Sequence, residues 1–176
     1  MRIIIVTGMP GAGKEELLSV AGSMGVPFTR MGDAVRDAYP SSQEYTIGLG
    51  IGQFAGAERE RHGKDIWARR TMERMGGGMF LVDGCRSMEE VASFKGLCGD
   101  VVIVGVHSPP EARYERLVRR GRDDAPRSRA EFDERDSREV SWGLAEVIAM
   151  ADMMIVNDGS LDEFRSASER ALRGLR

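Results

Sequence analysis

The residues best suited to chemistry form a glycine-rich segment near the start of the sequence, Gly8-Met9-Pro10-Gly11-Ala12-Gly13-Lys14. It follows the apolar, β-branched run Ile3–Val6, and residues 15–20 have the composition of a helix. Glycines let backbone N–H groups converge on an anion, a helix N-terminus adds positive potential, and a lysine here reaches the β- and γ-phosphates. The segment therefore predicts a phosphate-binding loop (P-loop) that binds ATP through Gly8, Pro10, Gly11, Ala12, Gly13 and Lys14.

The residue after the lysine departs from the usual pattern of this loop. Ser or Thr normally stands there and gives its hydroxyl to Mg²⁺, whereas this sequence has Glu15, followed by Glu16. Glu15 is either a carboxylate ligand of the metal or a solvent-facing residue stabilised by the helix dipole. We favour the solvent-facing position, because the triphosphate would repel a carboxylate beside it.

Composition limits the class of protein and its partners. The chain has 176 residues, of which 41% are apolar, so we expect a single domain over residues 1–176 with a full core. The net charge of −3 gives no electrostatic basis for binding nucleic acid or an anionic membrane. Cys85 and Cys98 lack metal-site spacing, which is typical of reduced thiols in a cytoplasmic protein. Neither a membrane span nor a signal peptide is expected.

Apolar runs and amphipathic stretches alternate along the chain. The strand candidates are residues 3–7, 26–31, 79–82, 101–106 and 153–156. The helical patterns cover residues 15–24, 64–75, 87–97, 110–120, roughly 131–150, and 161–172. Such alternation predicts an α/β fold, with a five-stranded parallel sheet between two layers of helices, as in the P-loop NTPases. Ligands of such sheets bind at the carboxyl ends of the strands.

Polar motifs follow these predicted strands. Met31-Gly32-Asp33-Ala34-Val35-Arg36 follows the second, Asp83-Gly84-Cys85-Arg86 the third, and Asn157-Asp158-Gly159-Ser160 the fifth. An arginine-rich stretch from Glu115 to Asp124 follows the fourth. Residues 121–136 are highly charged and nearly free of large apolar side chains, which indicates a surface excursion rather than a second domain.

These motifs resemble those of nucleoside monophosphate kinases, the adenylate and UMP/CMP kinase group. There a Gly-Asp-x-x-Arg element opens the acceptor-binding helix, an Asp-Gly motif with an arginine follows the third strand, and an arginine-rich lid closes over the phosphates. The stretch from Ala151 to Ser160 is similar to dephospho-CoA kinases. The whole chain most resembles a mostly archaeal family of P-loop kinases, with Met-Gly-Asp, Asp-Gly-x-Arg-Ser, Arg-Gly-Arg and Ser-Trp-Gly motifs matched at 31–33, 83–87, 120–122 and 141–143.

Two positions depart from the adenylate kinase pattern. Those kinases usually have Thr two residues after the P-loop lysine, where this chain has Glu16, and Pro before the arginine of the third-strand motif, where it has Cys85. Neither departure removes the charge that phosphoryl transfer needs.

The resemblance and the charge requirements of phosphoryl transfer together imply roles for individual residues. Lys14 and Mg²⁺ serve the donor, and Asp83 holds the metal or its water; otherwise Asp83 is a turn residue. Residues 121–136 form the lid, with Arg120 and Arg122 as catalytic arginines, unless these only make surface ion pairs. Arg116, Asn157 and Gly159 contact ATP, although the last two also suit a simple turn. The implied acceptor-binding residues are Gly32, Asp33, Arg36, Arg59, Gly84, Arg86, Arg135 and Arg138, with a solvated helix face as the alternative for Arg36 and Arg59.

The expected function is that of an ATP-dependent kinase that transfers the γ-phosphoryl group to a small, nucleotide-like acceptor. One alternative is a dephospho-CoA kinase-like enzyme that phosphorylates a hydroxyl, with Asp33 as general base. Another is a nucleotide-binding ATPase or switch that acts on a macromolecular partner. The arginines Arg36, Arg59 and Arg86 favour an acceptor that carries a phosphate.

Overall fold

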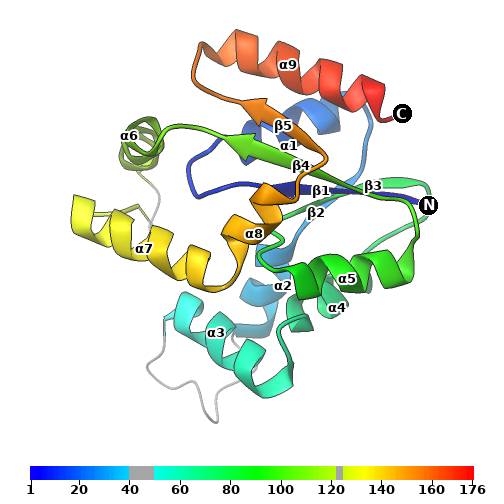
Figure 1. Ribbon diagram of the computed structural model, residues 1–176, viewed down its shortest axis with the longest axis horizontal. Helices are drawn as coiled ribbons and strands as arrows, with labels where there is room; N and C mark the ends of the chain where they lie inside the picture. The colour runs from blue at the N-terminus through cyan, green and yellow to red at the C-terminus, as the bar shows by residue number, and fades with distance from the viewer. Residues whose placement is uncertain (40–49, 122–124) are drawn as a thin grey trace.

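Helices cover both faces of a parallel sheet in the computed structural model, which describes residues 1–39, 50–121 and 125–176 (Figure 1). The strands are β1 (Arg2–Thr7), β2 (Phe28–Arg30), β3 (Met79–Asp83), β4 (Val101–His107) and β5 (Met153–Val156). They pair in the order β2-β3-β1-β4-β5, and every pair is parallel. The predicted α/β fold with a five-stranded parallel sheet is confirmed.

The helices connect the strands and extend beyond the sheet. They are α1 (Lys14–Ser23), α2 (Met31–Ala38), α3 (Ile51–His62), α4 (Ile66–Met72), α5 (Met88–Leu97), α6 (Pro110–Arg120), α7 (Arg129–Ser141), α8 (Leu144–Ala149) and α9 (Leu161–Gly174). None of the helices in the described ranges is long and apolar enough to cross a lipid bilayer.

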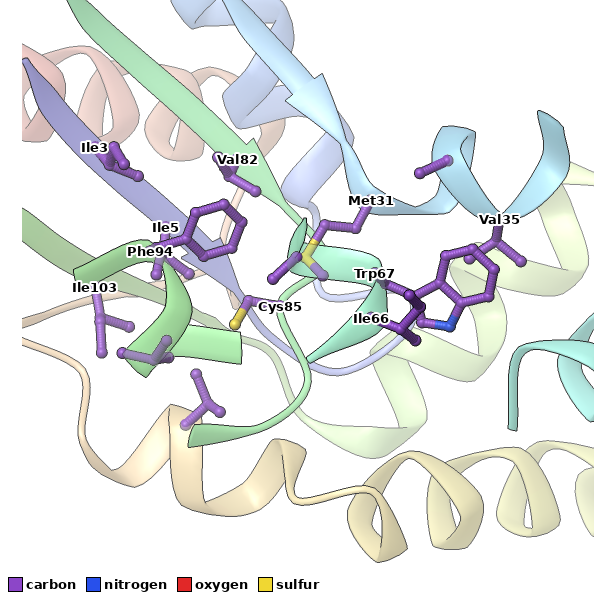
Figure 2. Close-up of a cluster of buried hydrophobic side chains, with 14 of the residues drawn as sticks. Ile3, Ile5, Met31, Val35, Ile66, Trp67, Val82, Cys85, Phe94 and Ile103 are labelled. Atoms are coloured by element: carbon purple, nitrogen blue, oxygen red, sulfur yellow. The ribbon is translucent and has the colours of Figure 1, made fainter. Parts of the chain in front are cut away.

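The central strand β1 is buried on both faces because its side chains alternate between two cores. Ile3 and Ile5 pack on the side of the sheet covered by α4, α5 and α8, together with Phe94 and Ile103 (Figure 2). The alternate residues of β1 pack on the other side, which α1 and α9 cover. A continuous β-branched run suits this position, since neither face meets water.

Two helices were not predicted from periodicity. The resemblance to nucleotide kinases implied α2, whereas α3 was considered only as a solvated helix face that carries Arg59. The expected helix over 131–150 is in fact α7 and α8, separated at Trp142 and Gly143. Gly143 has a φ of 103°, and a Cβ atom there would lie 3.3 Å from the carbonyl oxygen of Arg86. This close approach requires glycine and ends α7 against the loop that follows β3.

The predicted lid segment, residues 121–136, is partly helical. Residues 122–124, which include the proposed catalytic Arg122, lie outside the described residues. Residues 129–136 form the first turns of α7, where Phe132 is buried and contacts Tyr114 of α6 edge to face. Arg113 of α6 donates two hydrogen bonds to Asp136, at 3.0 and 2.6 Å. The description of this segment as nearly free of large apolar side chains overlooked Phe132, which packs it against α6.

Candidate functional site

A cavity of about 640 Å³ lies where the P-loop meets the carboxyl end of β3, within the range of roughly 300–1,000 Å³ typical of small-molecule sites. Its wall brings together most of the predicted site residues. Those of the P-loop, strand ends and helices that line it are Gly8, Pro10, Gly11, Gly13, Lys14, Glu15, Gly32, Arg36, Asp83, Gly84, Arg86, Arg116, Arg120, Arg135, Asn157 and Gly159. Ala12 is buried within the loop instead.

The P-loop is pressed closely against its neighbours. Gly8 has a φ of 149°, and a Cβ atom there would lie 2.3 Å from the carbonyl oxygen of Val106 in β4. Gly13 caps α1 with a φ of 114°, and its added Cβ would lie 2.3 Å from Nδ2 of Asn157. The loop thus presents the N-terminus of α1 to the cavity, where the first amides lack partners within the helix and can bind phosphate.

Lys14 begins α1 and folds back over the loop. Its Nζ donates to the carbonyl oxygens of Gly8 and Met9, at 2.6 and 3.3 Å. Burial lowers the pKa of Lys14, and the carboxylates of Asp83 and Glu139 oppose this effect. The ammonium therefore lies in a low-dielectric region near two carboxylates, where its charge has a strong effect on a bound phosphate.

Asp83 ends β3, in register with Val6 of the neighbouring strand β1. Its Oδ1 is buried and has no hydrogen-bond partner within the described ranges. Burial raises the pKa of Asp83, while Lys14 and Arg86 act in the opposite direction. An orphaned carboxylate oxygen in a cavity fits a ligand of Mg²⁺ or of its bound water.

No group of three or more His, Cys, Asp or Glu residues forms a metal cluster in the part of the chain that the structure describes. A single carboxylate such as Asp83 nevertheless suits Mg²⁺, which retains several waters and takes its other ligands from substrate phosphates.

Glu15 does not extend freely into solvent. Arg30, at the end of β2, donates from Nε to its Oε1 at 3.0 Å, and the Glu15 side chain is about 44% exposed. Glu16 is held similarly by Arg165 of α9, at 2.5 Å. Both acidic residues at the start of α1 are therefore engaged by arginines, which offsets part of their repulsion of a triphosphate.

The acceptor-side residues divide into those at the cavity and those away from it. Arg36 lines the cavity and pairs with Asp33 one turn earlier in α2, while Asp33 is not part of the wall. Arg59 is buried in an ion pair with Glu90 of α5 instead of facing the cavity. Arg138 lies over the ring of Trp142, 5.8 Å from the centroid, and is likewise not among the described lining residues.

The end of β5 is tied to the P-loop. Asn157 is buried, and its Nδ2 donates to the carbonyl oxygen of Ala12 at 2.8 Å. Arg116 of α6 donates from Nη2 to the backbone oxygen of Asn157 at 3.0 Å. Asn157 therefore braces the donor side of the cavity, and Gly159, Leu161 and Phe164 continue the wall beyond it.

Sequence reasoning missed Glu139, a buried carboxylate of α7 in the cavity wall. Its Oε2 accepts a hydrogen bond from Nε of Arg86 at 2.6 Å. Burial by itself raises the pKa of Glu139, but Arg86, Lys14 and Arg135 together outweigh this effect and the pKa is lowered. The only signals for it in the sequence were its position one helical turn after Arg135 and its closeness to the Ser-Trp-Gly motif.

The chain is similar to curated and solved proteins over nearly its whole length. UPF0200 protein TV0279 of Thermoplasma volcanium is 43% identical over 171 residues, which cover 97% of this chain and 96% of the relative. A shikimate kinase from Bacteroides thetaiotaomicron has a TM-score of 0.65 at 17% identity, with 99% and 98% of the two chains covered. A gluconokinase from Sinorhizobium meliloti 1021 has a TM-score of 0.62 at 15% identity, with coverages of 99% and 93%.

At such low identity the two solved structures establish a kinase-like P-loop fold and nothing finer. A match to the AAA domain covers residues 4–140, from β1 through most of α7. The chain therefore carries an AAA-type P-loop domain and belongs to the UPF0200 family.

Proposed function

We propose that the protein is an ATP-dependent phosphotransferase of the nucleoside monophosphate kinase type, with a small acceptor that itself carries a phosphate. The observation that carries the proposal is one cavity that holds a P-loop lysine, a strand-end carboxylate and acceptor-side arginines: Lys14, Asp83, Arg36 and Arg86. Phosphoryl transfer needs little beyond this, because it depends on holding two groups in line and neutralising charge.

The charge of the wall supports an anionic acceptor. Eight cationic side chains and five carboxylates line the cavity among the described residues. The excess of positive charge extends to the acceptor side, where Arg36 and Arg86 face the same space as the P-loop. Guanidinium groups bind the oxygens of a phosphate in pairs, which a neutral acceptor would leave unused.

The residues divide the work between donor and acceptor. When bound, Mg²⁺ supplies charge neutralisation and a template between the phosphates, and Asp83 is the residue that would hold it. Lys14 would leave the Gly8 carbonyl to bind the transferred phosphoryl group. Arg116, Arg120 and Arg135 line the cavity from α6 and α7 and would add positive charge over the phosphates.

A hydroxyl acceptor is the second candidate, and one observation favours it. The unpartnered Oδ1 of Asp83 lies buried at the cavity, where it could accept the proton of an attacking hydroxyl. The similar solved structures include a shikimate kinase and a gluconokinase. The base expected from the sequence, Asp33, is paired with Arg36 and does not line the cavity.

The decisive experiment is a screen for transfer from ATP. With Mg²⁺ present, the protein is incubated with each nucleoside monophosphate and with dephospho-CoA, and ADP formation is followed by a coupled assay. We expect ADP formation that depends on a nucleoside monophosphate. Turnover with dephospho-CoA alone would support the hydroxyl acceptor, and the absence of turnover with every nucleoside monophosphate would contradict the proposed function.

Binding of Mg-ATP should stabilise the fold. A ligand present at 100 times its dissociation constant adds about 2.7 kcal/mol to the free energy of unfolding. For a domain of this size, that corresponds to a rise of roughly 5–10 °C in the melting temperature. Differential scanning calorimetry with and without Mg-ATP measures the shift. If millimolar nucleotide leaves the melting temperature unchanged, the P-loop does not bind ATP.

The two acceptor types predict different effects for a pair of variants. With a phosphate acceptor, Arg36→Ala should raise the KM for the acceptor roughly tenfold or more and leave that for ATP unchanged, because a charge-assisted contact is lost on one side only. Asp33→Asn should then have a smaller effect. With a hydroxyl acceptor and Asp83 as base, both variants should leave kcat and the acceptor KM nearly unchanged, whereas a sharp fall in kcat in Asp33→Asn would assign the base to Asp33.

Steady-state kinetics of both variants separate these outcomes. Arg173→Ala is the matched control, since Arg173 is an exposed arginine that pairs with Glu169 on α9, on the opposite face of the sheet from α2. If Arg36→Ala and Asp33→Asn both behave like Arg173→Ala, no phosphate of the acceptor binds beside α2.

A further inference from the structure

The side chain of Arg86 connects the loop after β3 to the end of α7. Its Nε donates to Oε2 of Glu139 at 2.6 Å, and its guanidinium lies over the ring of Trp142, 5.6 Å from the centroid. Its backbone N–H donates to Oε2 of Glu90 at 2.6 Å. The preceding residue, Cys85, is buried in the core beside Ile5 (Figure 2). Arg86 is therefore held at both its backbone and its side chain.

The contact with Glu139 uses only one edge of the guanidinium. This side edge consists of Nε–H and one N–H of Nη2. The other edge, at the tip of the side chain, consists of one N–H each of Nη1 and Nη2, and we call it the end-on edge. Nη1 has only a long contact, 3.4 Å, with the carbonyl oxygen of Gly84, and Nη2 donates no hydrogen bond to any of the described residues. The end-on edge can thus bind two oxygens of a phosphate while Glu139 holds the other edge.

Glu139 is unusual among the carboxylates of the cavity wall, because it comes from α7 and is only about 5% exposed. It lies close enough to Lys14 to raise the pKa of the lysine, and the charges of Lys14 and Arg135 in turn lower the pKa of Glu139. A buried carboxylate in a phosphate site costs free energy unless a cation compensates it. Its hydrogen bond to Arg86 supplies that compensation and fixes the guanidinium at the same time.

The end of α7 also contacts the backbone of Arg86. A Cβ atom at Gly143 would lie 3.3 Å from the Arg86 carbonyl oxygen and 3.6 Å from Cα of Ser87. The Ser-Trp-Gly motif therefore packs Trp142 against the side chain of Arg86 and Gly143 against its main chain. This gives a structural role to a motif that the chemistry of phosphoryl transfer left unexplained.

We propose that Glu139 is a positioning residue. It holds the guanidinium of Arg86 against Trp142, so that the edge formed by Nη1 and Nη2 is available to the phosphate of the acceptor. The inference rests on the proposed function, because it assigns Arg86 to the phosphate of the acceptor. It also couples the position of α7 to that phosphate site, since any displacement of the helix end moves the guanidinium.

The first test needs no acceptor. The protein is saturated with Mg-ADP and titrated with inorganic phosphate, while arginine Nε–H signals are followed by NMR and the affinity by calorimetry. In the wild type, the Arg86 signal, assigned by its loss in Arg86→Lys, should exchange slowly and shift on addition of phosphate. Glu139→Gln should abolish the slow exchange and weaken phosphate binding by roughly 10–100-fold, the effect expected of a misplaced binding group.

Glu134→Gln is the matched control, because it removes the same charge from an exposed position of α7. It should bind phosphate like the wild type. Phosphate affinity that is unchanged or higher in Glu139→Gln would overturn the proposal, since Glu139 would then be idle or a competitor of the phosphate. If Glu139→Gln does not fold, the wild type decides: an Arg86 Nε–H that exchanges at the rate of solvent-exposed arginines would also overturn it.

Kinetics provide a second test that separates this inference from the proposed function. With an acceptor found by the screen, Glu139→Gln should raise the acceptor KM by roughly 10–100-fold, with a much smaller change in the KM for ATP. Wild-type turnover with an unaltered acceptor KM in Glu139→Gln would refute the role of Glu139 and leave the kinase function standing. No turnover by the wild type, with the phosphate titration as expected, would refute the function alone.

Discussion

Replacement of Lys14 by alanine is expected to reduce the rate of phosphoryl transfer by about 10²–10³-fold, the usual cost of removing a preorganised group that stabilises transition-state charge. The effect should be large because the ammonium is buried beside the P-loop carbonyls, in surroundings where charge is poorly screened. Single-turnover measurements with the acceptor identified by the screen give the rate directly.

Loss of the fold would not explain such a result. Lys14 contributes hydrogen bonds to two loop carbonyls at the cost of burying a charge, so its removal should change the melting temperature little. Lys64→Ala serves as the control, because Lys64 is about 68% exposed and pairs with Glu89 away from the cavity. Near-normal transfer by Lys14→Ala would mean that the donor phosphate binds elsewhere.

Replacement of Gly8 by alanine is expected to lower the free energy of unfolding by about 2–5 kcal/mol, the combined cost of backbone strain and overpacking. The new Cβ would lie 2.3 Å from a backbone oxygen of β4 in the centre of the sheet, and the φ of 149° is itself unfavourable for alanine. A backbone atom cannot move aside as a flexible side chain can, so either β4 or the P-loop must shift. Thermal or urea unfolding measures the loss.

Gly25→Ala is the matched control for this effect. Gly25 also has a positive φ, 71°, but an added Cβ there meets nothing within 4 Å. Gly25→Ala should therefore lower the free energy of unfolding only by the cost of a left-handed backbone conformation for alanine, roughly 1–2 kcal/mol. Equal losses at Gly8 and Gly25 would show that the close approach of the P-loop to β4 adds nothing to the cost of a Cβ atom at Gly8.

The sheet and the P-loop were predictable because their signals are local. Each strand is a short apolar run between turn residues, and burial on both faces needs no information about distant partners. The predicted helix over 110–120 matches α6, which begins with Pro110 and ends just before Gly121. Gly121 itself has a left-handed backbone conformation. Proline at a helix start and glycine just beyond its end are signals that a sequence shows directly.

Helix α3 could not be predicted in the same way, because its buried face is not apolar. Alongside Phe54, the helix buries the charged residues Glu58 and Arg59. Glu58 pairs with Arg70 of α4 at 2.7 Å, and Arg59 pairs with Glu90 of α5. A charged residue in a sequence is most simply interpreted as exposed, which is why Arg59 was assigned to a phosphate.

Glu139 was missed for a related reason. Its partner Arg86 lies 53 residues earlier in the chain, and no spacing rule connects residues so far apart. The sequence thus identified the groups that suit phosphate chemistry, but their pairing depended on how α7 packs against the loop after β3.

The hydrogen bond from Asn157 to Ala12 spans 145 residues, so this contact of the P-loop forms only after most of the chain has been synthesised. The ribosome makes the P-loop at the start of translation and Asn157 only near the end. A nascent chain shorter than this also lacks Phe164 of α9, so the sheet face that bears Ile4 and Val6 lacks part of its cover. Under the proposed function, ATP would therefore stabilise the chain only once Asn157 and α9 have been made, and until then this apolar face stays partly uncovered.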